Sequence, residues 1–467
     1  MTALHVTTTS GTTLALDAAI VQDFKTNLRG PLLCPGDAGY DDARHVWNGM
    51  IDRHPALIAR CAGATDVITA VTFARTHHLL VSVRGGGHNV PGIAVCQGGL
   101  MIDLAGMRSI RVDPVRRTAR AEGGTTWGDF DRETQAFGLA TTGGVVSSTG
   151  IAGLTLGGGL GWLAGKYGLA CDNLIAADLV TADGQLRHVS ASEHPDLFWG
   201  VRGGGGNFGV VTSFEYQLHA VGPVLAGIVL YPFTKAKEAL TVYRDFAMAC
   251  PDEVNTIGAL LTSPDGVPVV AIGVCYNGDL DVGERVLRPL RAFGSPLADE
   301  IRPMAYCQVQ TLFDAAFVRG QRYYFKSNFM QRISDGAIDV LIERFPTIPS
   351  PLSLVYFEQL GQAAHRVGAT ATAFSHRDAL CDWGCDAVWL DPAADGVHIA
   401  WTRELAEAMR PFTMGSDYAP HMGLETDEGV ERIQAAYGAN YERLVALKNT
   451  YDPTNLFRHN QNIKPTA

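Results

Sequence analysis

Two glycine-rich stretches constrain the fold of this chain more than any other part of its sequence. The first, Arg84–Asn89, reads Arg-Gly-Gly-Gly-His-Asn, and the second, Gly157–Trp162, reads Gly-Gly-Gly-Leu-Gly-Trp. Consecutive glycines allow positive φ angles and let a ligand approach the backbone, because no Cβ stands in the way. Their successive N–H groups can form an anion-binding concavity that suits a pyrophosphate. The two stretches therefore predict loops that hold one phosphate-bearing ligand from both sides.

A nucleophilic side chain accompanies each glycine stretch. His88 directly follows the first run of glycines. Cys171 lies beyond the second run, within Tyr167–Asn173, which reads Tyr-Gly-Leu-Ala-Cys-Asp-Asn. A histidine after glycines is, taken alone, an ordinary loop residue. The combination of an imidazole and a thiol is what separates this pattern from a generic phosphate loop.

The residues before the first glycine run predict a strand, a helix and a second strand. Leu57–Cys61 and Leu79–Val83 are short apolar runs, and Ala64–His77 has apolar residues at helical spacing. The second strand leads directly into Arg84–Asn89. A glycine loop directly after a strand is the context that a phosphate cradle requires.

Two segments also match the looser dinucleotide-binding fingerprint, Gly159–Ala164 and Gly204–Gly209. A Rossmann loop of this kind should open a long helix. The first match runs instead into Lys166–Gly168, and the second into a predicted strand at residues 210–216. We therefore do not expect a nicotinamide dinucleotide site.

The character of the sequence changes near Gly222. The glycine runs stop, and long apolar strands alternate with helical patterns. The predicted strands include Val224–Leu230 and Pro268–Val274, and the predicted helices are Lys235–Ala249, Val282–Ala292 and Gly336–Phe345. This alternation predicts an antiparallel sheet covered by helices. Since the chain has 467 residues, more than a single core usually holds, we expect two domains.

Charge, cysteine content and the N-terminus narrow the classes of function. The net charge of −11, without a Lys/Arg cluster, argues against nucleic-acid and anionic-membrane partners. Cys381 and Cys385 have no second Cys/His pair at zinc spacing, so we expect no metal and two ordinary thiols near a helix end. Residues 1–20 lack a basic, then apolar, leader pattern, and the expected location is cytoplasmic.

The glycine, histidine and cysteine motifs resemble those of the berberine-bridge-enzyme-like flavoproteins, a branch of the vanillyl-alcohol-oxidase (PCMH-type) FAD superfamily. The resemblance extends from near Trp47 to Asn460–Asn462. It implies an α+β fold with a PCMH-type FAD-binding domain of two α/β subdomains at residues 1–221. A substrate-binding domain with an antiparallel sheet covered by helices would occupy residues 222–421. A C-terminal segment, residues 422–467, would return to the FAD domain.

The same resemblance implies that FAD is attached covalently at two points, through His88 to the 8α-methyl group and through Cys171 to C6. It also implies a set of residues that contact the cofactor. They are Arg84, Gly85, Gly86, Gly87, Asn89, Thr142, Gly150, Gly153, Gly157, Gly158, Gly161, Asn173, Gly206, Val211, Asn460 and Asn462.

The family reaction is hydride transfer from a substrate C–H to flavin N5, with a base that removes a proton and O₂ that reoxidises the flavin to give H₂O₂. Relatives often use a tyrosine in a Tyr-x-Asn-Tyr-type segment as the base. Here the segment reads Tyr-Ala-Pro-His-Met from Tyr418, so His421 takes that place. An imidazole, with an ordinary pKa of about 6.5, accepts a proton near neutral pH. Tyr418 and Glu358 are the other candidates for the base.

The resemblance therefore implies an oxidase acting on an alcohol, a sugar or a secondary metabolite. One alternative is a dehydrogenase with another electron acceptor, because Leu174 occupies the position where a bulky residue disfavours oxygen in plant relatives. A second alternative is a flavin-binding protein without turnover. Neither the substrate nor the oligomeric state follows from these residues.

Overall fold

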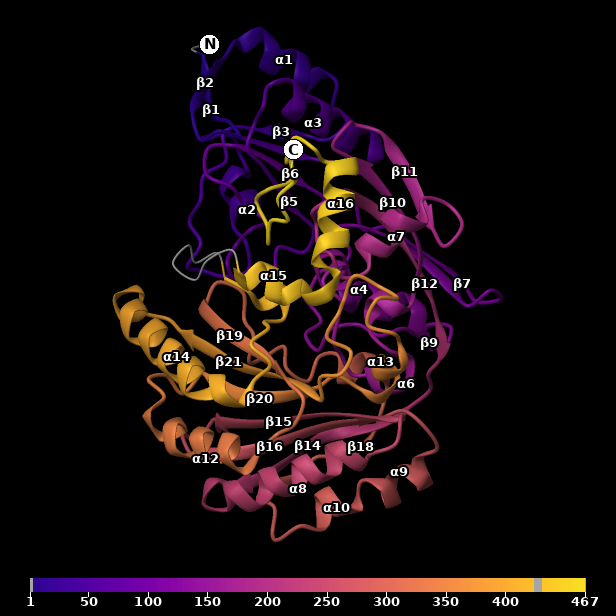
Figure 1. Ribbon diagram of the computed structural model, residues 1–467, viewed down its shortest axis with the longest axis vertical. Coiled ribbons are helices and arrows are strands. Elements are labelled where there is room, and N and C mark those ends of the chain that lie inside the picture. Colours follow the sequence, from indigo (N-terminus) through magenta and orange to yellow (C-terminus); the bar gives the residue numbers. More distant parts are fainter. Residues whose placement is uncertain (1–2, 424–430, 467) are drawn as a thin grey trace.

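The computed structural model describes residues 3–423 and 431–466. Figure 1 shows two parts stacked along the long axis of the molecule, with both chain termini in the same part. One part contains the strands up to Ala220, and the other contains the strands from Val224 onward. The change in sequence character near Gly222 therefore coincides with the passage from one part to the other.

The N-terminal part contains two main sheets. A four-stranded sheet has the order β3 (Leu32–Leu33), β4 (Leu57–Arg60), β6 (Leu100–Asp103) and β5 (Val81–Arg84). A five-stranded antiparallel sheet has the order β11 (Leu186–Ser190), β10 (Leu174–Thr181), β12 (Gly209–Gln217), β8 (Thr118–Glu122) and β7 (Ile110–Asp113). Smaller pairs are β1 (Leu4–Thr7) with β2 (Thr13–Leu16), and β9 (Leu139–Ala140) with β13 (His219–Ala220).

Short helices connect and cover these sheets. They are α1 (Ala18–Thr26), α2 (Tyr40–Arg44), α3 (Ala64–Thr76), α4 (Trp127–Gln135), α5 (Ile151–Leu156), α6 (Ala164–Tyr167) and α7 (Pro195–Val201). The predicted strand–helix–strand unit before the first glycine loop is confirmed as β4, α3 and β5. Because β5 ends at Arg84, the glycine loop begins where the strand stops.

The second part contains one eight-stranded sheet. Its order is β17 (Ala298–Asp299), β14 (Val224–Pro232), β16 (Pro268–Tyr276), β15 (Val254–Thr262), β20 (Leu354–Gln359), β21 (Cys381–Trp389) and β19 (Arg322–Met330), and β18 (Arg302–Met304) also pairs with β14. All these pairings are antiparallel. The predicted antiparallel sheet is thus confirmed. Cys381 and Cys385, expected near a helix end, lie instead in the buried strand β21.

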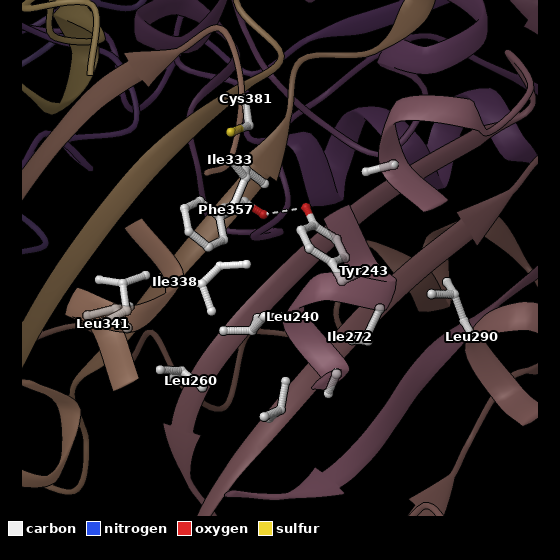
Figure 2. Packing of buried hydrophobic residues seen from close by; sticks show 14 of the residues in the cluster. Leu240, Tyr243, Leu260, Ile272, Leu290, Ile333, Ile338, Leu341, Phe357 and Cys381 are labelled. Atoms are coloured by element: carbon white, nitrogen blue, oxygen red, sulfur yellow. Dashed lines mark hydrogen bonds between the residues drawn. The ribbon is translucent and has the colours of Figure 1, made fainter. Parts of the chain in front are cut away.

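Helices cover the outer face of this sheet. They are α8 (Ala236–Ala249), α9 (Leu280–Val286), α10 (Arg288–Ala292), α12 (Asp335–Arg344) and α14 (Asp395–Met409), while α11 (Tyr306–Val309) and α13 (Gln362–Arg366) lie in connections. Figure 2 shows Leu240 and Tyr243 of α8 packed with sheet residues, where the Tyr243 hydroxyl donates to the Phe357 carbonyl oxygen at 2.9 Å. The helix predicted at Val282–Ala292 is two helices, because the chain turns at Leu287 before Pro289.

The C-terminal helices α15 (Glu431–Tyr437) and α16 (Tyr441–Tyr451) return to the N-terminal part, as Figure 1 shows. Leu444 and Leu447 of α16 join the core of the five-stranded sheet, and Leu456 and Phe457 join that of the four-stranded sheet. Burial of these side chains stabilises the return of the chain by roughly 1.5–3 kcal/mol for each large residue.

Asp131 of α4 is a buried acid where α4 meets α11. Its side chain is buried, and neither carboxylate oxygen has a hydrogen-bond partner. Burial raises the pKa of Asp131 to about 8, although Gln310 lowers it in part. Because folding raises the pKa of this acid, the folded protein loses stability as the pH rises from 3.8, the pKa of the acid in the unfolded chain, towards 8.

We expect Asp131→Asn to raise the melting temperature more at pH 8 than at pH 5, because the amide has no charge to desolvate. Thermal unfolding at both pH values measures the effect. Glu133→Gln, on the exposed side of the same helix, is the matched control. An equal change in melting temperature at both pH values would contradict the assignment of Asp131 as the titrating group.

Candidate functional site

A cavity of about 400 Å³ lies between the two parts of the molecule. Glycine loops of the N-terminal part form one wall, and the inner face of the eight-stranded sheet forms the opposite wall. Segments from residues 418–421 and 457–461 complete it. The cavity therefore combines a wall rich in backbone with a wall rich in side chains.

The glycine wall depends on close approach of two loops. A Cβ on Gly86 would lie 2.5 Å from the Cα of Gly150, so neither position tolerates a side chain. At Gly153 and Gly206, which also line the cavity, a Cβ would meet no atom within 4 Å. Their backbone is thus open to a ligand. Asn460 lines the same wall, and its buried side-chain oxygen lacks a hydrogen-bond partner.

His88 lies on the cavity wall at the end of the first glycine loop. Its ring stacks on Trp47 with centroids 4.2 Å apart, and its Nε2 lies 3.1 Å from the Ser148 hydroxyl. Burial lowers the pKa of His88 to about 4. The imidazole is therefore neutral at pH 7 and keeps a nitrogen lone pair, which a nucleophile requires.

The sheet wall is mostly apolar. Its side chains come from alternate positions of neighbouring strands, because alternate residues of a strand share one face. They include Ile228, Ile257, Ala259, Leu261, Ala271, Phe325, Leu354 and Tyr356. Two acids interrupt this apolar surface, Glu358 on β20 and Asp386 on β21.

His421 reaches the cavity from the turn at residues 419–421. Its Nδ1 lies 3.4 Å from Oδ2 of Asp382, whose side chain is fully buried. Burial lowers the pKa of His421, but the hydrogen bond and charge of Asp382, together with the charges of Asp386 and Glu358, outweigh it and raise the pKa overall. Asp382 therefore both orients the imidazole and increases its basicity.

The turn that carries His421 is attached to both glycine loops. The side-chain amide of Asn89 donates to the Pro420 carbonyl oxygen at 3.1 Å. The ring of Pro420 packs against Gly157, where a Cβ would lie 2.3 Å from Pro420 Cγ. The position of the imidazole is thus set by the loops of the opposite wall.

Tyr418 and Glu358, the other candidates for the base, also line the cavity. The Tyr418 hydroxyl accepts a hydrogen bond from the Gly159 N–H at 3.1 Å, and burial raises its pKa. Burial, with the charge of Asp382, raises the pKa of Glu358 to about 7, and His421 lowers it in part. A phenol with a raised pKa is a weaker proton acceptor at neutral pH than His421.

Comparison with known proteins places the chain in a family. Residues 55–190 match the family model of an FAD binding domain, and residues 419–464 match the model described as berberine and berberine like. The chain is 32% identical over 451 residues to an FAD-linked oxidoreductase of Dictyostelium discoideum, covering 96% of this chain and 97% of the relative. It is 33% identical over 458 residues to (R)-6-hydroxynicotine oxidase of Paenarthrobacter nicotinovorans, covering 94% and 97%.

This chain is a berberine-bridge-enzyme-like FAD-linked oxidoreductase. Its structure matches that of 6-hydroxy-D-nicotine oxidase from Arthrobacter nicotinovorans with a TM-score of 0.85 and 33% identity, covering 94% of this chain and 98% of the other. It matches a chitooligosaccharide oxidase with a TM-score of 0.84 and 24% identity, covering 96% and 100%. The predicted α+β, PCMH-type FAD-binding fold is confirmed.

The cavity of this oxidoreductase fits FAD. The open backbone at Gly153 and Gly206, the forced contact of Gly86 with Gly150, and the unpaired Asn460 oxygen are features that a ligand with phosphates and a ring would use. Eleven of the predicted contact residues lie on the wall: Gly85, Gly86, Gly87, His88, Asn89, Gly150, Gly153, Gly157, Gly206, Val211 and Asn460.

Six further predicted contact residues do not line the cavity: Arg84, Thr142, Gly158, Gly161, Asn173 and Asn462. Several of them hold neighbouring chain segments instead. The Thr142 hydroxyl donates to the Gly168 carbonyl oxygen at 2.7 Å, and the Asn173 amide donates to that of Leu169 at 2.8 Å. Gly161 allows the backbone to pass Gly143, whose oxygen would lie 1.5 Å from a Cβ. Thr142, Gly161 and Asn173 thus support the loops, and direct contact of the six residues with the cofactor stays a prediction.

Cys171, the second predicted attachment point, is also absent from the cavity wall. Its side chain is fully buried in a cluster with Leu169 and Phe374. The thiol lies 4.0 Å from the Arg377 guanidinium, which pairs with Asp172 at 2.7 Å. Burial, with the charge of Asp172, raises the pKa of Cys171, so the thiol is protonated at neutral pH. Its cluster also contains Leu160 and Tyr418, which line the cavity, and attachment of the cofactor through Cys171 stays a prediction.

Two other features bear on the alternatives. The fingerprint at Gly159–Ala164 opens only the four-residue helix α6, and that at Gly204–Gly209 leads into strand β12, so neither forms a Rossmann loop. Leu174 begins β10 and does not line the cavity. Within residues 3–423 and 431–466, no helix is long and apolar enough to cross a membrane.

Sequence reasoning missed Asp382 and Asp386. Both lie on β21, where they share one face with Gly384 between them, and that face is directed toward the cavity. Alternating acids in a strand usually indicate a solvated face. One signal could have identified them: a central strand is expected to be buried on both faces, so acids in such a strand are not exposed to solvent.

Proposed function

We propose that this chain is an oxidase that removes a hydride from a small molecule and passes the electrons to O₂, giving H₂O₂. The observation that carries the proposal is the pairing of His421 with buried Asp382 on the wall opposite the glycine loops. Relatives of similar length and fold are named as oxidases.

The glycine loops and His88 would hold FAD, which supplies an acceptor for the hydride. His421 takes a proton from the substrate, and Asp382 stabilises the imidazolium that results. Tyr418 keeps its proton and donates or accepts a hydrogen bond at the same wall. The apolar sheet wall excludes water from the reacting atoms.

We further propose that FAD is attached covalently through His88 alone. His88 is neutral and lines the cavity, whereas the Cys171 thiol is buried behind the wall beside Arg377. The double linkage implied by the sequence motifs would require Cys171 to leave this contact.

The alternative of a dehydrogenase depends on Leu174, whose side chain is buried and does not line the cavity.

A direct experiment distinguishes an oxidase from a dehydrogenase. The purified protein is photoreduced without oxygen and then mixed with aerated buffer, while flavin absorbance and peroxide are followed. An oxidase recovers its absorbance within seconds with one peroxide per flavin. Slow recovery with oxygen and rapid recovery with a quinone would refute the oxidase and support the dehydrogenase.

A further inference from the structure

We propose that Trp47 and Ser148 are positioning residues that hold the His88 imidazole in the orientation required for covalent attachment of FAD. The proposal rests on the attachment through His88 proposed above and names the residues that assist it. Two observations carry it. An aromatic stack fixes the plane of the imidazole, and a hydrogen bond selects one of the two orientations that the stack allows.

The plane of the His88 ring is set by a stack of three aromatic side chains. The indole of Trp47 stacks on the His88 imidazole with centroids 4.2 Å apart and planes 19° apart. It also stacks on the Tyr323 ring of β19, with centroids 3.7 Å apart and planes 22° apart. An imidazole stacked in this way cannot tilt without losing the ring contact.

Both parts of the molecule hold Trp47 in place. Its backbone N–H donates to the carbonyl oxygen of Gly87, directly before His88, at 2.9 Å. Its indole N–H donates to the Phe317 carbonyl oxygen at 3.3 Å, and its own carbonyl oxygen accepts from the Gly320 N–H at 2.9 Å. Only 4% of Trp47 is exposed. The orientation of His88 therefore depends on contacts that the second part of the chain makes with Trp47.

Ser148 selects the orientation of the ring within this plane. A half-turn about the Cβ–Cγ bond of His88 keeps the ring in the stack but moves both nitrogens to the other side. In the structure, Nε2 lies 3.1 Å from the Ser148 hydroxyl oxygen, and the half-turn would break this hydrogen bond. Ser148 is exposed, so its hydroxyl also connects the ring to solvent, which can take up a released proton.

The attachment step explains why orientation matters. A nitrogen of the imidazole forms a bond with the 8α carbon, while one C–H bond of the 8α-methyl group and the N–H bond of the imidazole break. Two protons are released, and the two remaining electrons reduce the flavin. O₂, the acceptor of the proposed oxidase, takes these electrons with two protons to give H₂O₂. The nitrogen lone pair lies in the ring plane, so a tilted or turned ring directs it away from the carbon.

The test measures how much of the His88 peptide carries flavin. Each purified protein is incubated with FAD in air, and mass spectrometry follows the attached fraction over time. We expect Trp47→Leu, which keeps an apolar side chain but no aromatic face, to slow attachment by about 10²-fold. Acid should release about one FAD per protein from this variant, because the glycine loops still bind it. Trp47→Phe keeps an aromatic face and should attach FAD within about tenfold of the wild-type rate.

Two further variants complete the experiment. Ser148→Ala removes the hydrogen bond at an exposed position, where folding is not at risk, and should slow attachment by about 2- to 10-fold. Trp389→Leu is the matched control. Trp389 is a buried indole that stacks on His398 with centroids 4.6 Å apart, and it does not line the cavity. Its replacement should leave attachment at His88 complete.

The outcomes distinguish the two proposals. A wild-type His88 peptide without flavin would refute attachment through His88, and the positioning roles with it. Wild-type attachment that persists at full rate in both Trp47→Leu and Ser148→Ala would overturn the positioning roles alone. Equal slowing in Trp389→Leu would also overturn them, because the effect would then be general destabilisation. Reoxidation of the photoreduced protein by O₂ is measured separately, so failure of the oxidase function is recognised independently.

Discussion

His88→Ala is expected to abolish covalent attachment of the flavin. The wild-type protein, precipitated with acid, should give a yellow pellet, and the variant should give a colourless pellet with FAD in the supernatant. The reason is chemical, because alanine has no nucleophile, whereas the neutral imidazole of His88 lines the cavity at the end of the first glycine loop and can form the bond. Absorbance of pellet and supernatant at the flavin maximum measures the result.

Cys171→Ser is the matched variant for this experiment. Because the thiol lies in the core beside Arg377, we expect its replacement to leave the flavin in the pellet, attached through one peptide that contains His88. Mass spectrometry of the flavopeptides identifies the attached residue. A yellow pellet from His88→Ala, or a flavopeptide that contains Cys171, would show that the thiol reaches the cofactor and would restore the double linkage.

His421→Ala is expected to slow anaerobic reduction of the flavin by about 10²–10⁴-fold, the range typical for loss of a general base. The experiment uses a substrate identified by bleaching and compares rates in single turnovers, so that reoxidation does not contribute. Tyr418→Phe is the comparison, because the phenol has a raised pKa and donates or accepts without losing its proton. We expect a smaller decrease for Tyr418→Phe, and the reverse order of effects would assign the proton transfer to Tyr418.

Asp382→Asn tests the same assignment through pH. The charge and hydrogen bond of Asp382 raise the pKa of His421, so the amide should lower it. A base must be neutral to accept a proton, and the rate falls as the pH drops through its pKa. The acidic limb of the rate profile should therefore move to lower pH in Asp382→Asn. A limb at unchanged pH would show that His421 is not the group that titrates.

The sequence predicted the glycine loops, the two-part architecture and the position of His88 beside a ligand cavity, because each depends on local residue types. A run of glycines after a strand needs no knowledge of distant segments. The surroundings of Cys171 are harder to predict. Its motif lies next to a glycine loop along the chain, but the thiol also contacts Arg377, which comes from a segment 206 residues away.

The acids of β21 were missed for a related reason. Their spacing shows that Asp382 and Asp386 share a face, but only the pairing of β21 with β19 and β20 shows that this face is buried and opens on the cavity. Such non-local pairings are absent from any single stretch of sequence. Function here depends on which face of a strand lacks solvent.

The contacts of Pro420 have a consequence for how this enzyme can change. The turn with His421 is held by Asn89 and Gly157, which belong to the cofactor loops, and the pocket that selects the substrate is built on another part of the chain. Substitutions on β14, β15 or β16 can thus reshape the pocket while His421, the proposed proton acceptor, keeps its position against the glycine loops. An enzyme built in this way can acquire new substrates through mutations in the eight-stranded sheet, without a change in the loops that hold the cofactor.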